Sequence, residues 1–205
     1  MDSQATNNDL MEIAKVHKIC FPENFSTILG IKFSLLEKFY KEYLIKTPEL
    51  FLVAENEHRE IIGFCMGYYC ESNTYMKDYF KHNLFSIGLR LSLLLLTGNK
   101  VAWKKLCNSK KSTEWVIKNH SFDSIMINER GDLLSICVLP EYRGAGIAQG
   151  LMDEYLTVLK KQNRKLCILS VDPRNGRGVH FYEKNGFVLY KSNGETTASY
   201  VKLLG

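Results

Sequence analysis

Residues 133–161 read LLSICVLPEYRGAGIAQGLMDEYLTVLKK, and this stretch carries the strongest structural signals of the chain. The apolar residues Ile136-Cys137-Val138 are compatible with β-structure, and Pro140 closes the run, which predicts a strand. Residues 147–161 place a large apolar side chain at every fourth position, which predicts an amphipathic helix: Ile147, Leu151, Tyr155 and Leu159. The stretch therefore predicts a strand, a short loop and a helix, in that order.

The loop between strand and helix is Arg143-Gly144-Ala145-Gly146-Ile147-Ala148. Glycine allows positive φ and lets a ligand approach the main chain closely. The helix that follows begins with unpaired N–H groups and the positive end of its dipole. Together these features predict an anion site at the helix N-terminus, most naturally a phosphate site.

Spacing excludes two common phosphate loops. A P-loop needs Gly-Lys-Ser/Thr at the helix entry, which Gly146-Ile147-Ala148 does not provide. A dinucleotide fingerprint needs Gly-x-Gly-x-x-Gly, but position 149 is Gln and Gly150 comes one residue late. The pattern that remains, Arg-x-x-Gly-x-Ala, resembles the acyl-CoA pyrophosphate loop of the GNAT acyltransferase superfamily. Taken alone, the loop could also be an ordinary strand-to-helix turn in which the glycines only permit the turn.

A second signature follows about 30 residues later. Asn175 to Phe187 read NGRGVHFYEKNGF, which resembles the GNAT segment in which an Asn precedes a helix ending Phe-Tyr-Glu-Lys-x-Gly-Phe. The two signatures occur in the family's order. The resemblance implies one GNAT domain over residues 1–205, an α/β protein with a mixed sheet of the α+β kind.

The order of the other predicted elements agrees with this resemblance. Helices are predicted over 10–20 and 31–45, followed by an antiparallel hairpin of 51–55 and 61–70. Gly63 and Gly67 in the second strand of this hairpin indicate a bulge or a close approach. The family's usual first strand is reduced to a few polar residues before Asp9, which is a departure. After the cofactor helix come a strand, a short helix and two closing strands, at residues 165–172, 178–184, 187–191 and 199–204.

Residues 75–112 form a predicted helical insertion between the hairpin and the cofactor strand. The common GNAT core has no such segment. Three interpretations stay open, which are a lid over the acceptor site, a homodimer surface and additional core packing. The apolar run 84–97 is too short to span a bilayer and contains Arg90, so no stable membrane anchor is expected.

Composition sets further bounds. The chain has 205 residues, 45% of them apolar, which favours one sizeable core. A net charge of +5 suits a polyanionic cofactor but is not concentrated enough to predict nucleic-acid binding. The six cysteines show no Cys-x-x-Cys and no zinc-ligand spacing, so no metal site is predicted. Reduced, buried thiols and a polar N-terminus without a signal peptide predict a cytoplasmic protein.

The resemblance assigns acetyl-CoA as cosubstrate. It implies that the N–H groups of Arg143, Gly144, Ala145, Gly146, Ile147 and Ala148 bind the pyrophosphate, with Gln149 at the rim. The backbone of Ile136, Cys137 and Val138 is expected to pair with the pantetheine arm like an added strand. Asn175 matches the family's pantetheine-contacting Asn, and capping of its helix is a compatible second role.

The resemblance also implies three catalytic roles. A backbone N–H of the cofactor strand, expected to be that of Val138, stabilises the oxyanion. Tyr182 occupies the position of the family's general acid, and packing that only orients the sulfur is its alternative role. Asp132, six residues before Val138, is the predicted base, with Glu71 and Glu23 as rivals. Cys137 as an acyl nucleophile is disfavoured, because a thiol on an apolar strand is usually inert.

The predicted function is acetyl-CoA-dependent N-acetylation of a primary amine. A pattern running from Phe21-Pro22 to Phe33 resembles GNAT enzymes of bacterial surface-sugar gene clusters, which favours an amino-sugar acceptor. Acetylation of a protein N-terminus or lysine is the first alternative. A non-catalytic CoA-binding module is the second.

Overall fold

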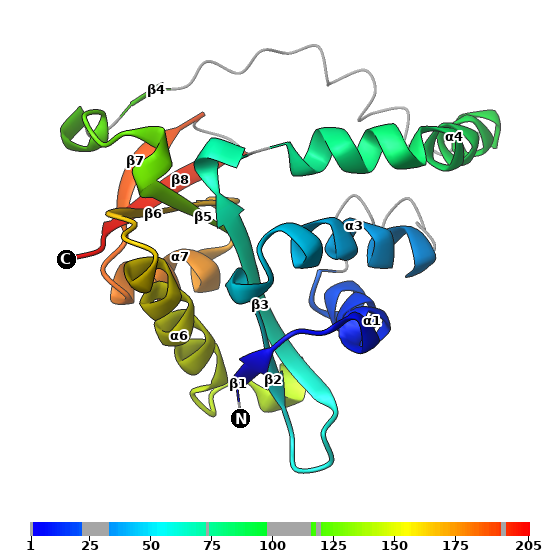
Figure 1. Cartoon of the computed structure of the whole chain (residues 1–205), viewed down its shortest axis with the longest axis horizontal. Helices are drawn as coiled ribbons and strands as arrows, with labels where there is room; N and C mark the ends of the chain where they lie inside the picture. The colour runs from blue at the N-terminus through cyan, green and yellow to red at the C-terminus, as the bar shows by residue number, and fades with distance from the viewer. Residues whose placement is uncertain (1, 22–32, 73, 98–115, 118–119, 194–195) are drawn as a thin grey trace.

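A computed structural model describes residues 2–21, 33–72, 74–97, 116–117, 120–193 and 196–205. They form one mixed sheet in which only β5 and β6 run parallel (Figure 1). Across the sheet the order is β1 (Asp2–Gln4), β2 (Phe51–Glu55), β3 (Ile61–Tyr69), β5 (Arg130–Val138), β6 (Leu166–Val171), β8 (Ala198–Leu203), β7 (Val188–Ser192) and β4 (Val116–Ile117). The predicted mixed α/β class is confirmed.

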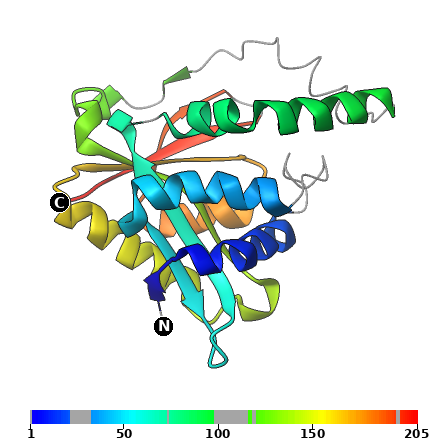
Figure 2. The same ribbon diagram turned by 45° about the vertical axis from the view of Figure 1, so that its right-hand side comes forward.

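Helices cover both faces of the sheet (Figures 1 and 2). On one face lie α6 (Ile147–Lys161) and α7 (Gly176–Lys184), whose apolar sides bury one core against the sheet. On the other face lie α1 (Leu10–Cys20) and α3 (Phe33–Lys46), which bury a second core rich in aromatic rings. The insertion begins with α4 (Tyr75–Leu96), which packs on α3.

The first strand of the sheet is present but very short. Three residues of β1 pair antiparallel with β2, and Ser3 lies opposite Val53. The N–H of Ala5 then donates to the carbonyl of Phe51 at 2.8 Å, which closes the edge. Because backbone pairing needs no apolar side chains, a polar sequence can form this edge strand, which explains the weak sequence signal.

The parallel strands β5 and β6 pair over four residues only. Arg130 to Leu133 lie opposite Leu166 to Leu169, and beyond this point β6 pairs with β8 alone. Residues 135–138 of β5 therefore pair with β3 on one side and with no strand of the described chain on the other. The sheet opens here, next to the start of α6.

A bulge lies at the same point. The register between β3 and β5 shifts after Met66, so Met66 lies opposite Ser135 while Gly67 lies opposite Leu133. Leu134 is the extra residue. A Cβ on Gly67 would lie 2.0 Å from both the carbonyl oxygen of Asp132 and the hydroxyl of Tyr155, so only glycine fits.

Several predicted segments lie outside the described residues: 22–32, which contains Glu23, and 98–115, which contains most of the second half of the insertion. The described helices and strands agree with their predicted ranges, except that β5 begins earlier and β4 was not predicted. Among the described helices, none combines the length and the hydrophobicity needed to cross a bilayer.

Candidate active site

The loop before α6 forms an open cradle of backbone N–H groups. Gly144 has φ +87° and Gly146 has φ +82°, and a Cβ at either position would meet no atom within 4 Å. Within the described chain, no N–H group of residues 144–149 donates to a backbone carbonyl. The first such bond of this helix runs from Gly150 to Gly146 at 3.0 Å. These groups face open space at the positive end of a 15-residue helix, which is the geometry that binds an anion.

Arg143 ties this loop back to the strand. Its Nε donates to the carbonyl oxygen of Val138 at 3.1 Å, while the residue as a whole stays exposed. The bond uses one of the five guanidinium N–H groups, so the others can meet a phosphate oxygen. Arg143 can therefore hold the loop and contact the anion at the same time.

Gln149 connects the start of α6 with the end of α7. Its amide nitrogen donates to Asp153 at 2.9 Å and to the side-chain oxygen of Asn185 at 2.6 Å. Asn185 in turn caps α7 by donating to the carbonyl of Phe181 at 2.9 Å. The side chain of Gln149 thus fixes the two helices beside the cradle, and its own N–H group stays free for the proposed rim contact.

The unpaired edge of β5 presents backbone groups toward the opening. The N–H of Leu139 donates to Ile62 of β3 at 2.8 Å. Because hydrogen-bonding direction alternates along a strand, the N–H groups of Val138 and Ile136 are expected to point away from β3, into the gap beside β6. The predicted oxyanion donor therefore lies on the correct side of the strand, and Ile136 is an equivalent second donor.

The N-terminus of α7 lies beyond this gap. The side-chain oxygen of Asn175 accepts a hydrogen bond from the N–H of Gly178 at 3.1 Å, which is the predicted helix cap. The amide NH2 group of Asn175 donates to no acceptor in the described chain. Asn175 can therefore cap α7 and still donate to a ligand in the gap.

Tyr182 projects from α7 into the core below the gap. Its ring packs edge-on to Phe181 and Phe187, with ring centroids 5.6 and 6.0 Å away. Burial, and to a lesser extent the nearby thiols of Cys65, Cys167 and Cys137, raises the pKa of Tyr182 well above 10. The hydroxyl forms no hydrogen bond within the described part of the chain. It is thus a protonated donor without a partner beside β5 and β6.

Asp132 is largely buried at the paired start of β5. It accepts a hydrogen bond from the hydroxyl of Tyr68 at 3.0 Å. Burial raises the pKa of Asp132 from 3.8 to about 6, while the Tyr68 hydrogen bond and the charge of Lys191 oppose this shift. A carboxylate with a pKa near 6 is ionised at neutral pH and accepts protons better than an ordinary aspartate.

The rivals of Asp132 differ in their surroundings. Glu71 forms an ion pair with Arg164 at 2.7 Å, and the guanidinium of Arg164 lies 4.1 Å from the ring centre of Tyr69. This pairing favours a structural role for Glu71. Glu23 lies outside the described residues.

Cys137 lies beside a second thiol. Burial, with a smaller effect of the Cys20 thiol at the end of α1, raises the pKa of Cys137 well above 9. The Cys20 thiol itself donates to the carbonyl of Val138 at 3.4 Å. A protonated, buried thiol is a poor nucleophile. The expected lack of nucleophilic function for Cys137 therefore agrees with its environment.

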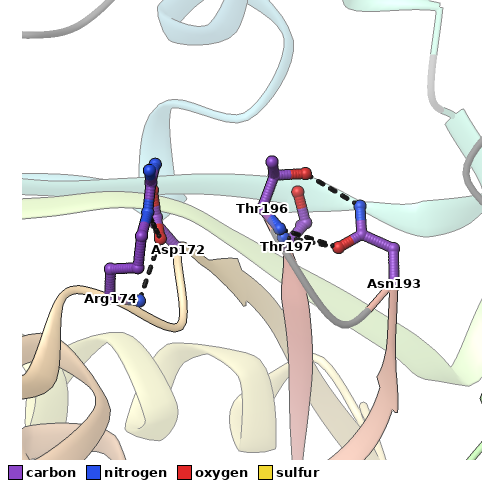
Figure 3. A network of polar contacts seen from close by, with 5 residues as sticks. All are labelled: Asp172, Arg174, Asn193, Thr196 and Thr197. Carbon is purple, nitrogen blue, oxygen red and sulfur yellow. Dashed lines mark hydrogen bonds and ion pairs between the residues drawn. The ribbon is translucent and has the colours of Figure 1, made fainter. Parts of the chain in front are cut away.

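Two short polar turns border the gap (Figure 3). Arg174 pairs with Asp172 just after β6, where the distance from Nε to Oδ1 is 2.9 Å, and this pairing lowers the pKa of Asp172 to about 2. In the β7–β8 hairpin, Asn193 accepts hydrogen bonds from the N–H groups of Thr196 and Thr197. The two turns are neighbours because Val171 at the end of β6 pairs with Ala198.

Sequence reasoning missed two features of this site, which are the Tyr68–Asp132 hydrogen bond and the Asp172–Arg174 pair. The bulge at Leu134 agrees with the prediction made from Gly67, since a glycine within a strand marks a bulge or a close approach. The Tyr68 contact joins two strands 64 residues apart in sequence, and no local pattern encodes it. Among the described residues, no group of three or more His, Cys, Asp or Glu could hold a metal ion.

Comparison with known proteins gives matches in sequence and in structure. Residues 111–189 match the family model described as acetyltransferase (GNAT) domain. N-alpha-acetyltransferase 30 of Schizosaccharomyces pombe (strain 972) is 36% identical over 62 residues, which are 30% of this chain. The aligned stretch covers 41% of that curated relative's length.

Solved structures match over nearly the whole chain. Ard1 from Thermoplasma volcanium has a TM-score of 0.58 at 16% identity, covering 100% of this chain and 97% of its own. PaiA N-acetyltransferase from Thermoplasma acidophilum, solved in complex with coenzyme A, has a TM-score of 0.57 at 18% identity. It covers 99% of this chain and 98% of its own. At these identities the likeness shows the fold.

The fold and the site define an α/β protein in which two parallel strands separate beside the open N-terminus of a helix. Residues 111–189, which contain both predicted signatures, match the GNAT acetyltransferase domain. The family resemblance predicted from Arg143–Ala148 and Asn175–Phe187 is confirmed over this stretch.

Proposed function

We propose that the chain is an acetyl-CoA-dependent N-acetyltransferase acting on a primary amine. One observation carries the proposal, which is that the open N–H cradle of residues 144–149 lies directly beyond the unpaired edge of β5. A pyrophosphate in the cradle and an extended, amide-bearing arm along residues 136–138 satisfy both sets of backbone groups. The CoA complex of the PaiA relative supports this choice of cosubstrate.

The residues around the gap supply the chemistry of acyl transfer. The nitrogen lone pair of the acceptor attacks the thioester carbon, and the N–H of Val138 or Ile136 stabilises the oxyanion that forms. Collapse breaks the C–S bond, and Tyr182 donates a hydrogen bond or its proton to the departing thiolate. Asp132 accepts the proton that the amine loses, directly or through water. No covalent enzyme intermediate is needed.

Two acceptor classes remain within this proposal. The pattern at residues 21–33 favours an amino sugar, and the polar turns at Asp172 and Asn193 offer partners for sugar hydroxyls. The 36% identity to N-alpha-acetyltransferase 30 favours the α-amine of a polypeptide. Both classes react through the uncharged form of a primary amine.

The first experiment is a thermal melt with acetyl-CoA, followed by an acceptor screen. At about 100 times a micromolar Kd, binding adds about 2.7 kcal/mol and raises Tm by about 5–10 °C. CoA release is then measured with free and nucleotide-linked amino sugars, with a peptide, and with that peptide blocked at its N-terminus. Turnover of the free but not the blocked peptide identifies an N-terminal acetyltransferase. A Tm unchanged by acetyl-CoA or longer acyl-CoAs contradicts the proposed cosubstrate.

Removing the hydroxyl of Tyr182 tests the general acid. We expect Tyr182→Phe to lower kcat about 100-fold with little change in acetyl-CoA affinity, because the hydroxyl acts on the departing sulfur. Tyr190→Phe is the matched control, since the Tyr190 hydroxyl bonds Asp123 at 2.7 Å in a separate cluster. If Tyr182→Phe keeps full turnover, Tyr182 is not the general acid and its role is packing.

A further inference from the structure

Among the α4 side chains that the structure describes, the buried ones form one narrow stripe. Tyr75, Tyr79 and Asn83 follow at intervals of four, and each is less than 10% exposed. The hydroxyl of Tyr79 donates to the carbonyl of Leu35 at 3.1 Å, and His82 pairs with Glu42 at 2.9 Å. These contacts hold the first half of α4 on α3 and fix which side of the helix faces outward.

Several large apolar side chains of α4 are strongly exposed, with Leu84 at 70%, Phe85 at 84%, Leu89 at 53% and Leu96 at 83%. Phe85, Leu89 and Leu96 are four and seven residues apart, so they share one face of the helix. Figure 2 shows α4 running along α3 at the edge of the molecule. Exposed apolar residues gathered on one helix indicate an interaction surface.

Lysines border this apolar face. A shallow groove of about 240 Å³ between α3 and α4 is lined by Lys38, Lys41, Glu42, Ile45, His82 and Asn83. The two lysines are exposed, Ile45 is 65% exposed, and the one carboxylate, Glu42, is paired with His82. We name Lys38, Lys41, Ile45, His82, Phe85 and Leu89 the α3–α4 surface.

The charge of the chain is concentrated in the same region of the sequence. Residues 75–112 hold eight of the 27 Lys and Arg but only one of the 22 Asp and Glu. This stretch therefore carries +7, while the remainder of the chain carries −2. At the level of sequence, this distribution favours an anionic partner for the insertion.

We propose that the α3–α4 surface docks on an anionic lipid membrane, as a peripheral and reversible contact. The exposed Phe and Leu side chains of α4 enter the boundary between headgroups and acyl chains, and the lysines meet lipid phosphates. The exposed lysines of α3 and α4, Lys38, Lys41, Lys77 and Lys81, favour this occupant over a second copy of the chain, because two copies would bring these like charges together. The inference is independent of the acetyl-transfer proposal.

Vesicle flotation of the full chain tests the proposal. We expect binding to phosphatidylcholine vesicles with about 30% phosphatidylserine to exceed binding to pure phosphatidylcholine at least tenfold, and to weaken as salt rises. Phe85→Ser with Leu89→Ser, and separately Lys38→Glu with Lys41→Glu, should each lower binding about tenfold or more. Val188→Ser with Leu203→Ser removes two exposed apolar side chains from the sheet and should leave binding unchanged.

The remaining outcomes overturn the proposal. Equal flotation of the wild type with neutral and anionic vesicles excludes the lipid charge as a determinant. If the Val188→Ser, Leu203→Ser control also loses vesicle binding, the α3–α4 surface is excluded as the specific membrane contact. Sedimentation of the free wild type as a dimer, with a monomeric Phe85→Ser, Leu89→Ser variant and no vesicle binding, assigns the surface to a second copy. Circular dichroism and Tm confirm that every variant is folded.

Discussion

Gly146→Asp is expected to weaken acetyl-CoA binding strongly while the fold persists. Gly146 has φ +82°, which Asp and Asn adopt more readily than other non-glycine residues, and its Cβ would point into open space. The new carboxylate would lie at the centre of the cradle, beside the expected pyrophosphate. Two unit charges 4 Å apart near a protein surface repel by about 4 kcal/mol, so we expect acetyl-CoA affinity to fall about 100- to 1000-fold.

Gly146→Asn separates charge from shape. Asparagine has the same size and the same backbone cost at positive φ but carries no charge, so its affinity should fall about tenfold at most. Isothermal titration calorimetry of both variants with acetyl-CoA measures the difference, and Tm without ligand should be nearly equal for the two. Equal affinities for Asp and Asn would place the pyrophosphate elsewhere.

The features that sequence predicted well are those with local signals. The strand, loop and helix of residues 133–161 were predicted because apolar periodicity, proline and glycine act within a few residues of each other. The cap of α7 by Asn175 was predicted for the same reason. A local rule also anticipated the close approach at Gly67.

The features that sequence could not predict are produced by contacts between distant residues. β4 has two residues and exists only through pairing with β7, so it carries no pattern of its own. The raised pKa of Asp132 depends on burial by strands and helices far along the chain. Its role as a candidate base came from a position in a family pattern, and the structure supplies the physical reason why that carboxylate differs from Glu71.

Asp132→Asn is expected to lower turnover and raise stability together. The folded protein holds the pKa of Asp132 at about 6, against 3.8 for the ordinary group, so folding favours the protonated form. The protonated carboxyl of Asp132 therefore makes its full contribution to folding stability below pH 4, and this contribution is lost as pH rises through 6. At pH 8 the ionised carboxylate opposes folding. A shift of this size corresponds to about 3 kcal/mol if fully expressed, and we expect about 2 kcal/mol because the carboxyl group retains some solvent contact.

The asparagine variant lacks this pH-dependent cost and can still accept the Tyr68 hydrogen bond. We expect its free energy of unfolding to exceed that of the wild type by about 2 kcal/mol at pH 8, and the difference to vanish near pH 4. Its kcat/KM should fall about 100-fold or more at pH 8, because the amine loses its proton acceptor. The wild-type profile should decline below about pH 6, and the variant should lack that step.

Glu71→Gln is the control, and its expected effects on stability and on turnover are opposite to those of Asp132→Asn. It leaves Arg164 without its ion-pair partner, and the Nε of Arg164 is already buried without a hydrogen bond in the described chain. We therefore expect lower stability and retained turnover for this variant. Urea unfolding and steady-state kinetics at pH 4, 6 and 8 measure both quantities. If Asp132→Asn keeps wild-type turnover, the base lies elsewhere, and if it loses stability at pH 8, the charged hydrogen bond from Tyr68 outweighs the cost of burial.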